Sequence, residues 1–162
     1  MNLSGALNPN PDWASALVGS SWISYGPTGA SSDPGYFSPA DGTDVTFSTQ
    51  FILSGAITSA SLTVLADDST TVILNGTTLI YASTTSPCPA GCVSWTTVVL
   101  NFAALGPYLV DGTNTLSFSV VQLGGQSYGL DFSGNVDPPT PEPSAWLLMA
   151  AGLLGLALVR KK

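Results

Sequence analysis

Carboxylates carry most of the chemistry that this sequence could perform. The chain has no histidine and its single glutamate, Glu142, lies near the C-terminus, so acid and base roles would fall on aspartates. Asp67 or Asp68, paired with Asp131, would supply the two carboxyl groups that glycoside hydrolysis requires. The alternative is that Asp67 and Asp68 form a tight turn and bond their own backbone. Because supporting polar catalytic groups are missing, we expect no catalytic residues and no enzyme activity.

The same three aspartates are candidates for a structural metal site. Carboxylate oxygens are hard ligands that suit Ca²⁺, and Asp67, Asp68 and Asp131 are the candidate donors. Their spacing does not match an EF-hand loop. A structural calcium ion is therefore the one cofactor that the residues suggest.

Aromatic side chains near polar loops form a second candidate site. Aromatic rings stack on sugars while Asp and Asn bond hydroxyl groups. The candidate glycan-binding residues are Trp22, Tyr25, Tyr36, Tyr81, Trp95 and Tyr128. The alternative is that the tryptophans fill the core, since large aromatic residues are mostly buried.

Two cysteines, Cys88 and Cys92, are separated by three residues that include Pro89 and Gly91. We expect a disulfide that closes this small loop, worth about 2 kcal/mol in the chain-entropy account. A redox pair would normally be spaced C-x-x-C, and a metal site would need further Cys or His ligands that the chain lacks. A disulfide implies an oxidising compartment.

The distribution of charge excludes one class of partner. The formal net charge is −7, and the three basic residues, Arg160, Lys161 and Lys162, end the chain. Residues 1–159 therefore contain no Lys or Arg, which rules out binding of this body to a nucleic-acid backbone.

The sequence predicts β-strands as the elements that position the candidate aspartates and aromatic residues. Residues 45–53 alternate apolar and polar side chains, as does the stretch that follows the Asp111-Gly112 turn signal. Asn75-Gly76 predicts a type I′ hairpin turn. Residues 94–102 and 128–136 predict two further strands.

These elements together predict one all-β domain over residues 1–136. About seven or eight short strands at such spacing favour an antiparallel β-sandwich of jelly-roll type. Residues 1–44 are rich in Pro and Gly, and we expect Trp13 and Trp22 to dock on the sandwich as anchors.

The C-terminal residues differ in composition from this domain. Residues 137–144 form a Pro-rich linker, and residues 145–162 predict an apolar helix with a basic end. The fifteen uncharged residues 145–159 would span about 22 Å as a helix, against roughly 30 Å for the hydrocarbon core of a bilayer. Spanning is tight, and Arg160, Lys161 and Lys162 should stay on the cytoplasmic side.

The stretch from Pro141 to Lys162 resembles the PEP-CTERM sorting signal of bacterial exported proteins. The resemblance covers the triplet Pro141, Glu142 and Pro143, a short apolar segment and a terminal basic cluster. It implies export, transient anchoring in the inner membrane and recognition of the triplet by an exosortase, a membrane cysteine peptidase. An exported chain should begin with a signal peptide, which residues 1–13 do not match, so we expect the reading frame to begin upstream.

The body resembles galactose-binding-like sandwich domains, through "NPDW" at 10–13, "SSWI" at 20–23, "ADDSTTVILNG" at 66–76 and "DGTNTLSFSVVQ" at 111–122. Such sandwiches host many ligands or none. The expected function is that of an exported, non-enzymatic cell-surface or extracellular-matrix protein. The alternative is a carbohydrate-binding module for exopolysaccharide, and the third possibility is an Asp-based glycosidase.

Overall fold

The computed structural model describes residues 10–84 and 98–137, and seven strands lie in these ranges. They are β1 (Asp44–Leu53), β2 (Ser59–Asp67), β3 (Ser69–Leu74), β4 (Thr77–Ile80), β5 (Val98–Leu100), β6 (Gly112–Val121) and β7 (Gly129–Asp137). A one-turn helix, α1 (Phe102–Leu105), and a 3-10 turn (Gly106–Tyr108) join β5 to β6. The mostly β prediction is confirmed.

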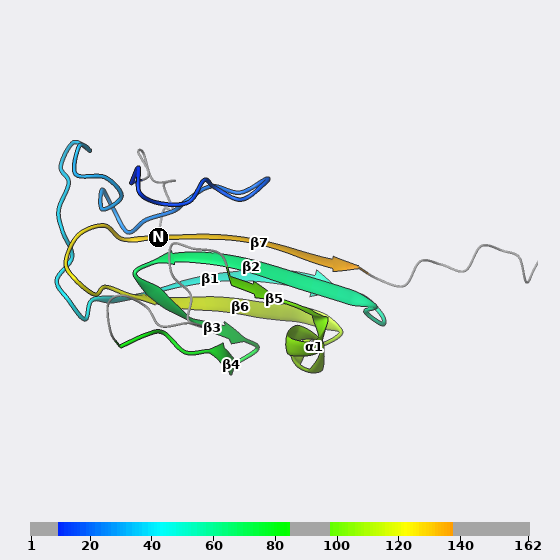
Figure 1. Ribbon diagram of the computed structural model, residues 1–162. Helices are drawn as coiled ribbons and strands as arrows, with labels where there is room; N and C mark the ends of the chain where they lie inside the picture. The colour runs from blue at the N-terminus through cyan, green and yellow to red at the C-terminus, as the bar shows by residue number, and fades with distance from the viewer. Residues whose placement is uncertain (1–9, 85–97, 138–162) are drawn as a thin grey trace, which may run out of the picture.

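The strands form two antiparallel sheets, with the orders β1-β6-β3-β4 and β5-β2-β7. Figure 1 shows β7 leaving the domain at the end where α1 also lies, which we call the tail end. Both sheets contribute to one hydrophobic core, because alternate residues of each strand point inward. Phe118 of β6 meets Phe132 of β7 across this core at 4.6 Å between ring centroids.

Turn chemistry agrees with the sequence at the β3–β4 hairpin. Asn75 has φ of 50° and Gly76 has φ of 81°, so both residues of the turn are left-handed as a type I′ turn requires. The predicted turn at Asp67 and Asp68 is also present, and its peptide bond is cis. It carries the chain from one sheet to the other, since β2 and β3 belong to different sheets.

Residues 10–43 have little regular structure and are held by long-range contacts. Ile23 and Leu130 exchange backbone hydrogen bonds of 2.8 and 2.9 Å, which attaches this segment to β7. Trp13 and Trp22 are buried beside Leu65. The expectation that these tryptophans dock on the sheets is confirmed.

The strand expected over residues 94–102 needs correction, and the jelly-roll assignment is not tested by the structure. The strand expected over residues 94–102 is described only as β5, and the chain turns into α1 because Asn101 accepts hydrogen bonds from the amides that follow it. Two antiparallel sheets are present, while the jelly-roll assignment stays a prediction. Asp137, expected as the first linker residue, is instead the last residue of β7. The rest of the linker and the C-terminal helix expected over 145–162 lie outside the described residues, and within the described ranges no helix could cross a membrane.

Candidate functional site

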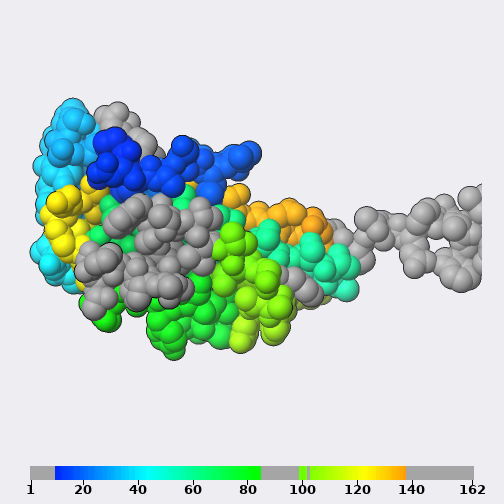
Figure 2. Space-filling model, in the orientation of Figure 1, coloured from blue at the N-terminus to red at the C-terminus, as the bar shows by residue number. Residues whose placement is uncertain are grey.

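The site forms where residues 10–23 cover the outer face of the β5-β2-β7 sheet. Leu65 pairs with Asp131, and Asp67 pairs with Gly129, so these four side-chain positions share one face. Figure 2 shows the N-terminal segment (blue) lying along one side of the domain. Asp67 and Asp131 therefore lie beneath a segment that is more than 50 residues away from each of them in the chain.

Two stacked tryptophans make this cover. The rings of Trp13 and Trp22 are 4.3 Å apart between centroids. Trp13 donates a hydrogen bond of 2.6 Å from Nε1 to Oδ2 of Asp67, and Trp22 donates one of 3.0 Å to the carbonyl of Ala14. A Cβ atom at position 129 would lie 2.5 Å from the Trp13 ring, so only glycine fits beneath it.

Asp131 is enclosed by the same cover. Its side chain is 1% exposed, and its Oδ2 accepts a hydrogen bond of 2.8 Å from the amide of Leu17. Its Oδ1 has no hydrogen-bond partner among the described residues. Asp131 therefore fixes the covering segment and does not face the hollow described next.

Asp67 and Asp68 line a polar hollow of about 260 Å³ beside the cover, together with Asp12, Trp13 and Ser127. Asp68 accepts a hydrogen bond of 2.6 Å from the amide of Leu123. This bond ties the β2–β3 turn to the loop between β6 and β7.

Burial dominates the electrostatics of this carboxyl pair. It raises the pKa of Asp67 to about 7, against the opposing effect of the Trp13 hydrogen bond and with a further increase from the charge of Asp68. Burial also raises the pKa of Asp68, while the Leu123 amide opposes that rise. Residues 1–159 contain no Lys or Arg whose charge would oppose this rise in the pKa of the two carboxyl groups.

The predicted metal site is not assembled. Within residues 10–84 and 98–137, no three acidic, His or Cys side chains are grouped so that they could hold a metal ion. Asp67 and Asp68 line the hollow, while Asp131 is buried and accepts a hydrogen bond from the amide of Leu17, so the three predicted calcium ligands do not line one hollow.

Burial also corrects the glycan candidates. Trp22 is 3% exposed and Tyr128 is fully buried, so neither offers a ring face to a ligand. The Tyr128 hydroxyl instead accepts a hydrogen bond from the amide of Val45 and donates one to the carbonyl of Val120, which connects the start of β7 to the opposite sheet. Burial raises the pKa of Tyr128 above its usual value.

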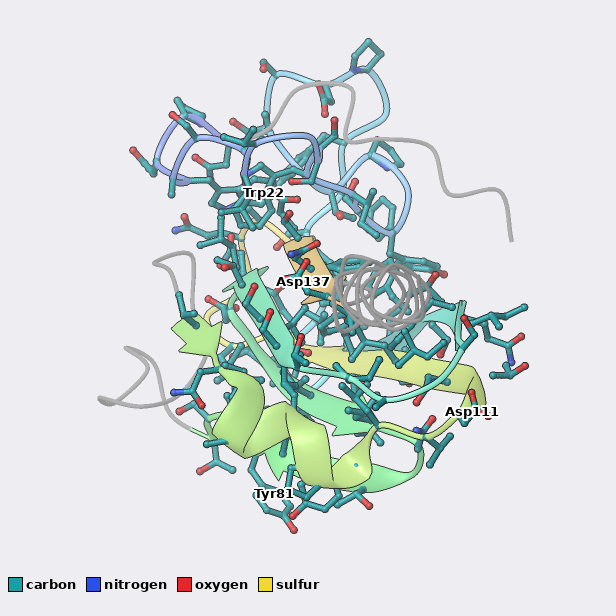
Figure 3. All side chains as sticks on the ribbon, turned by 90° about the vertical axis from the view of Figure 1, so that its right-hand side faces the viewer. Trp22, Tyr81, Asp111 and Asp137 are labelled. Carbon is teal, nitrogen blue, oxygen red and sulfur yellow. The ribbon has the colours of Figure 1, made fainter. Side chains whose placement is uncertain are left out.

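The remaining described candidates are dispersed. Tyr25 is exposed and makes an edge contact with Phe37, at 6.3 Å between ring centroids. Tyr36 donates a hydrogen bond of 2.8 Å to the carbonyl of Gln126. Tyr81 is 76% exposed, and Figure 3 places it on the opposite side of the domain from Trp22.

Tyr36 lines a second polar hollow, of about 440 Å³, that adjoins the first. The two hollows share Asn10, Asp12, Gln126 and Ser127. Asn10 and Ser127 are joined by a side-chain hydrogen bond of 2.6 Å. We call the two hollows together the polar cleft; carboxylates, amides and hydroxyls line it.

Several predicted residues lie outside the described ranges. These are Cys88, Cys92, Trp95, the triplet Pro141, Glu142 and Pro143, and the basic residues Arg160, Lys161 and Lys162. Among the residues that sequence reasoning did not name as site candidates, Gln126 carries no local signal. Gly129 does, because a glycine within a predicted strand indicates close approach by another group.

No curated protein matches the chain. Two solved structures are similar in part: α-L-rhamnosidase from Dictyoglumus thermophilum, with 15% identity over 75% of this chain, and α-L-rhamnosidase from Aspergillus terreus, with 18% identity over 83%. Both have a TM-score of 0.46, and the match covers 14% and 17% of those enzymes. The chain thus corresponds to a small part of their length.

The comparison with protein families bears on how the chain is sorted by the cell. Residues 139–162 match the family described as the PEP-CTERM protein-sorting motif, and the matched range contains the triplet at 141–143. Such a motif implies an exported protein that is directed to the cell surface and processed by an exosortase. The chain carries a PEP-CTERM protein-sorting motif at its C-terminus.

Proposed function

We propose that this protein is a non-enzymatic component of the cell surface or extracellular matrix, anchored for a time in the inner membrane through residues 145–159. The observation that carries the proposal is the sorting motif at residues 139–162. In this account, Arg160, Lys161 and Lys162 stay on the cytoplasmic side. The exosortase then acts near Pro141, Glu142 and Pro143 and releases the domain.

The position of the motif relative to the domain supports this account. β7 ends at Asp137, so the last strand stops before the linker begins. Prolines in residues 138–144 favour an extended backbone. A peptidase needs an extended segment that is free of the fold, and the proline content of residues 138–144 favours one at this place in the sequence.

Substitution of the triplet tests the proposal. In the native host, Pro141→Ala combined with Glu142→Ala should leave the full-length chain in the membrane fraction and reduce surface release at least tenfold. Thr140→Ser is the matched control and should be processed normally. Unchanged release of the double variant would contradict the proposed role of the triplet.

The absence of enzyme activity is also part of the proposal. Its support is that Asp67 and Asp68 are engaged by Trp13 and Leu123, and that their expected partner Asp131 is buried and bonded to the amide of Leu17. Asp67→Asn with Asp68→Asn should leave surface retention unchanged. Hydrolysis of a glycoside by the natural protein that disappears in this variant would contradict the proposal.

A second candidate function is carbohydrate binding, and the polar cleft favours it. Amides, hydroxyls and carboxylates around one depression suit a polyhydroxylated ligand, and Tyr36 adds an aromatic ring. Titration calorimetry with fragments of the host's exopolysaccharide tests it. Binding that weakens at least tenfold in Gln126→Ala, but not in the distant control Tyr81→Ala, would support it, and no binding heat would exclude it.

A further inference from the structure

An apolar groove opens between the two sheets at the tail end. Its volume is about 350 Å³, and the lining is mostly aliphatic and aromatic: Phe51, Leu74, Leu105, Leu109, Phe132 and Val136 are members. Figure 3 looks onto this end of the domain and labels Asp111 and Asp137 there. The groove is on a different part of the molecule from the polar cleft, since the two share no lining residue.

The groove exists because three inward positions carry small residues. On β1, Thr49 stands between the inward residues Phe47 and Phe51. Gly134 on β7 and Ala60 on β2 take the corresponding places in the other sheet. Large side chains at these positions would close the edge of the sandwich, as interiors are normally close-packed.

We propose that this groove is the docking site for the first apolar residues of segment 145–159 of the same chain, whenever that segment is not in a membrane. A buried apolar cavity of about 150 Å³ accepts a molecule the size of benzene, so 350 Å³ has room for two or three large side chains. Trp146, Leu147 and Leu148 are the first large apolar residues after the linker. The inference does not depend on cleavage by an exosortase.

Tethering selects this occupant over a second copy of the protein. Val136 lines the groove and the last strand ends at Asp137, so the chain leaves the domain at the rim. Residues 138–144 reach about 22 Å at 3.1 Å per extended residue. A short linker of this kind holds the segment at an effective concentration in the millimolar range, above the concentration of free protein in most settings.

Docking would make the exposure of the apolar groove depend on where segment 145–159 lies. Segment 145–159 is uncharged and apolar, so water disfavours both it and the open groove. In the docked state, the groove and the segment shield each other's apolar surface from water, and this ends when the segment enters a membrane. Removal of the tail at the sorting motif would then release a domain whose groove is open to other apolar partners.

The test is a double-mutant cycle in the full chain, without lipid or detergent. Trp146→Ser, Leu147→Ser and Leu148→Ser together form the tail variant, and urea unfolding is followed by the far-ultraviolet circular dichroism of the two β-sheets. If the docked state exceeds the undocked state tenfold, the tail variant should lower the urea midpoint by roughly 0.7 M, for an m value of about 2 kcal/mol/M.

Position 49 supplies the second arm of the cycle. Thr49→Phe fills the groove and should abolish the effect of the tail variant, while the nearly isosteric Thr49→Val leaves the groove open and should preserve it. Ala60→Val is a second filling variant in case Thr49→Phe does not fold.

Three outcomes would overturn the proposal. The first is a tail variant with no effect on the midpoint. The second is an effect that persists unchanged in both filling variants, because the tail would then stabilise the domain elsewhere. The third is an effect that grows with protein concentration, which would indicate association with a second copy.

Discussion

At the scale of single residues, the missing side chain of Gly129 leaves the space that the Trp13 ring occupies. We predict that Gly129→Ala lowers the free energy of unfolding by about 2 to 3 kcal/mol, because its Cβ would overlap the Trp13 ring and displace it from Asp67. Urea unfolding checks this. Gly134→Ala, on the same strand, is the matched control and should cost less, since its Cβ would lie 3.3 Å from the Ser61 carbonyl oxygen, a tight contact that needs only a small shift. Equal losses in the two variants would contradict the packing account.

The buried carboxyl of Asp67 predicts an unusual dependence of stability on pH. Its pKa rises from 3.8 in the unfolded chain to about 7 in the folded protein, so the folded state binds a proton more tightly between these values. The free energy of unfolding should therefore fall as pH rises from about 4 to 7, by at most about 1.4 kcal/mol per pH unit. Urea unfolding at four pH values in this window measures the slope.

Asp67→Asn is the control for that pH dependence. The amide oxygen can still accept the hydrogen bond from Trp13 Nε1, but the side chain no longer titrates. The slope should flatten and not vanish, because burial also raises the pKa of Asp68. A variant with the full slope of the natural protein would assign the effect to other groups.

The sequence predicted some of these residues and missed others for physical reasons. Asp67 and Asp68 were assigned to a turn because the signal is local, and the turn is present. The partners of these carboxyls, Trp13 and Leu123, are more than 50 residues away, and no sequence pattern encodes such a contact. The prediction that Tyr128 binds glycan is wrong because the sequence does not show whether an aromatic side chain beside a polar loop points outward or into the core.

At the scale of elements, a pair of asparagines organises the tail end. Asn114 of β6 is fully buried, accepts hydrogen bonds from the amide of Val110 and the side chain of Asn75, and donates to the carbonyls of Val110 and Gly112. These bonds join the β3–β4 turn to the segment before β6. The groove is thus bordered by a region whose backbone is held by side chains.

We predict that Asn114→Ala lowers the free energy of unfolding by about 2 to 4 kcal/mol, because the partners left behind lose their hydrogen bonds in a buried site. Thermal or urea unfolding measures it. Ser117→Ala, on the same strand, removes only an exposed hydrogen bond to Ser48 and should change stability by less than about 0.5 kcal/mol. A similar loss in both variants would contradict this assignment.

The elements differ in how far the sequence predicted them. β1, the β3–β4 hairpin and β6 follow from alternation and from Asn-Gly or Asp-Gly turns, which are local signals. The path of residues 10–43 does not, because it is set by isolated contacts such as the Ile23–Leu130 bridge. Helix α1 was missed because its four residues are too short for a helical period to show.

At the scale of the whole molecule, the charge and the sorting motif point to one account. The body carries no Lys or Arg, and the basic residues occupy only the last three positions. A released domain would therefore be wholly acidic, which suits solubility outside the cell. The cation cluster acts in the tail alone, where it would set the orientation of the apolar segment in the membrane.

The most direct test of this account is the intact mass of the protein recovered from the cell surface of the native host. We predict a C-terminus close to Pro141, Glu142 and Pro143, without the apolar segment 145–159, and a full-length chain when the host's exosortase is deleted. A surface protein that still ends in Lys162 would contradict the central claim and make the tail a permanent anchor.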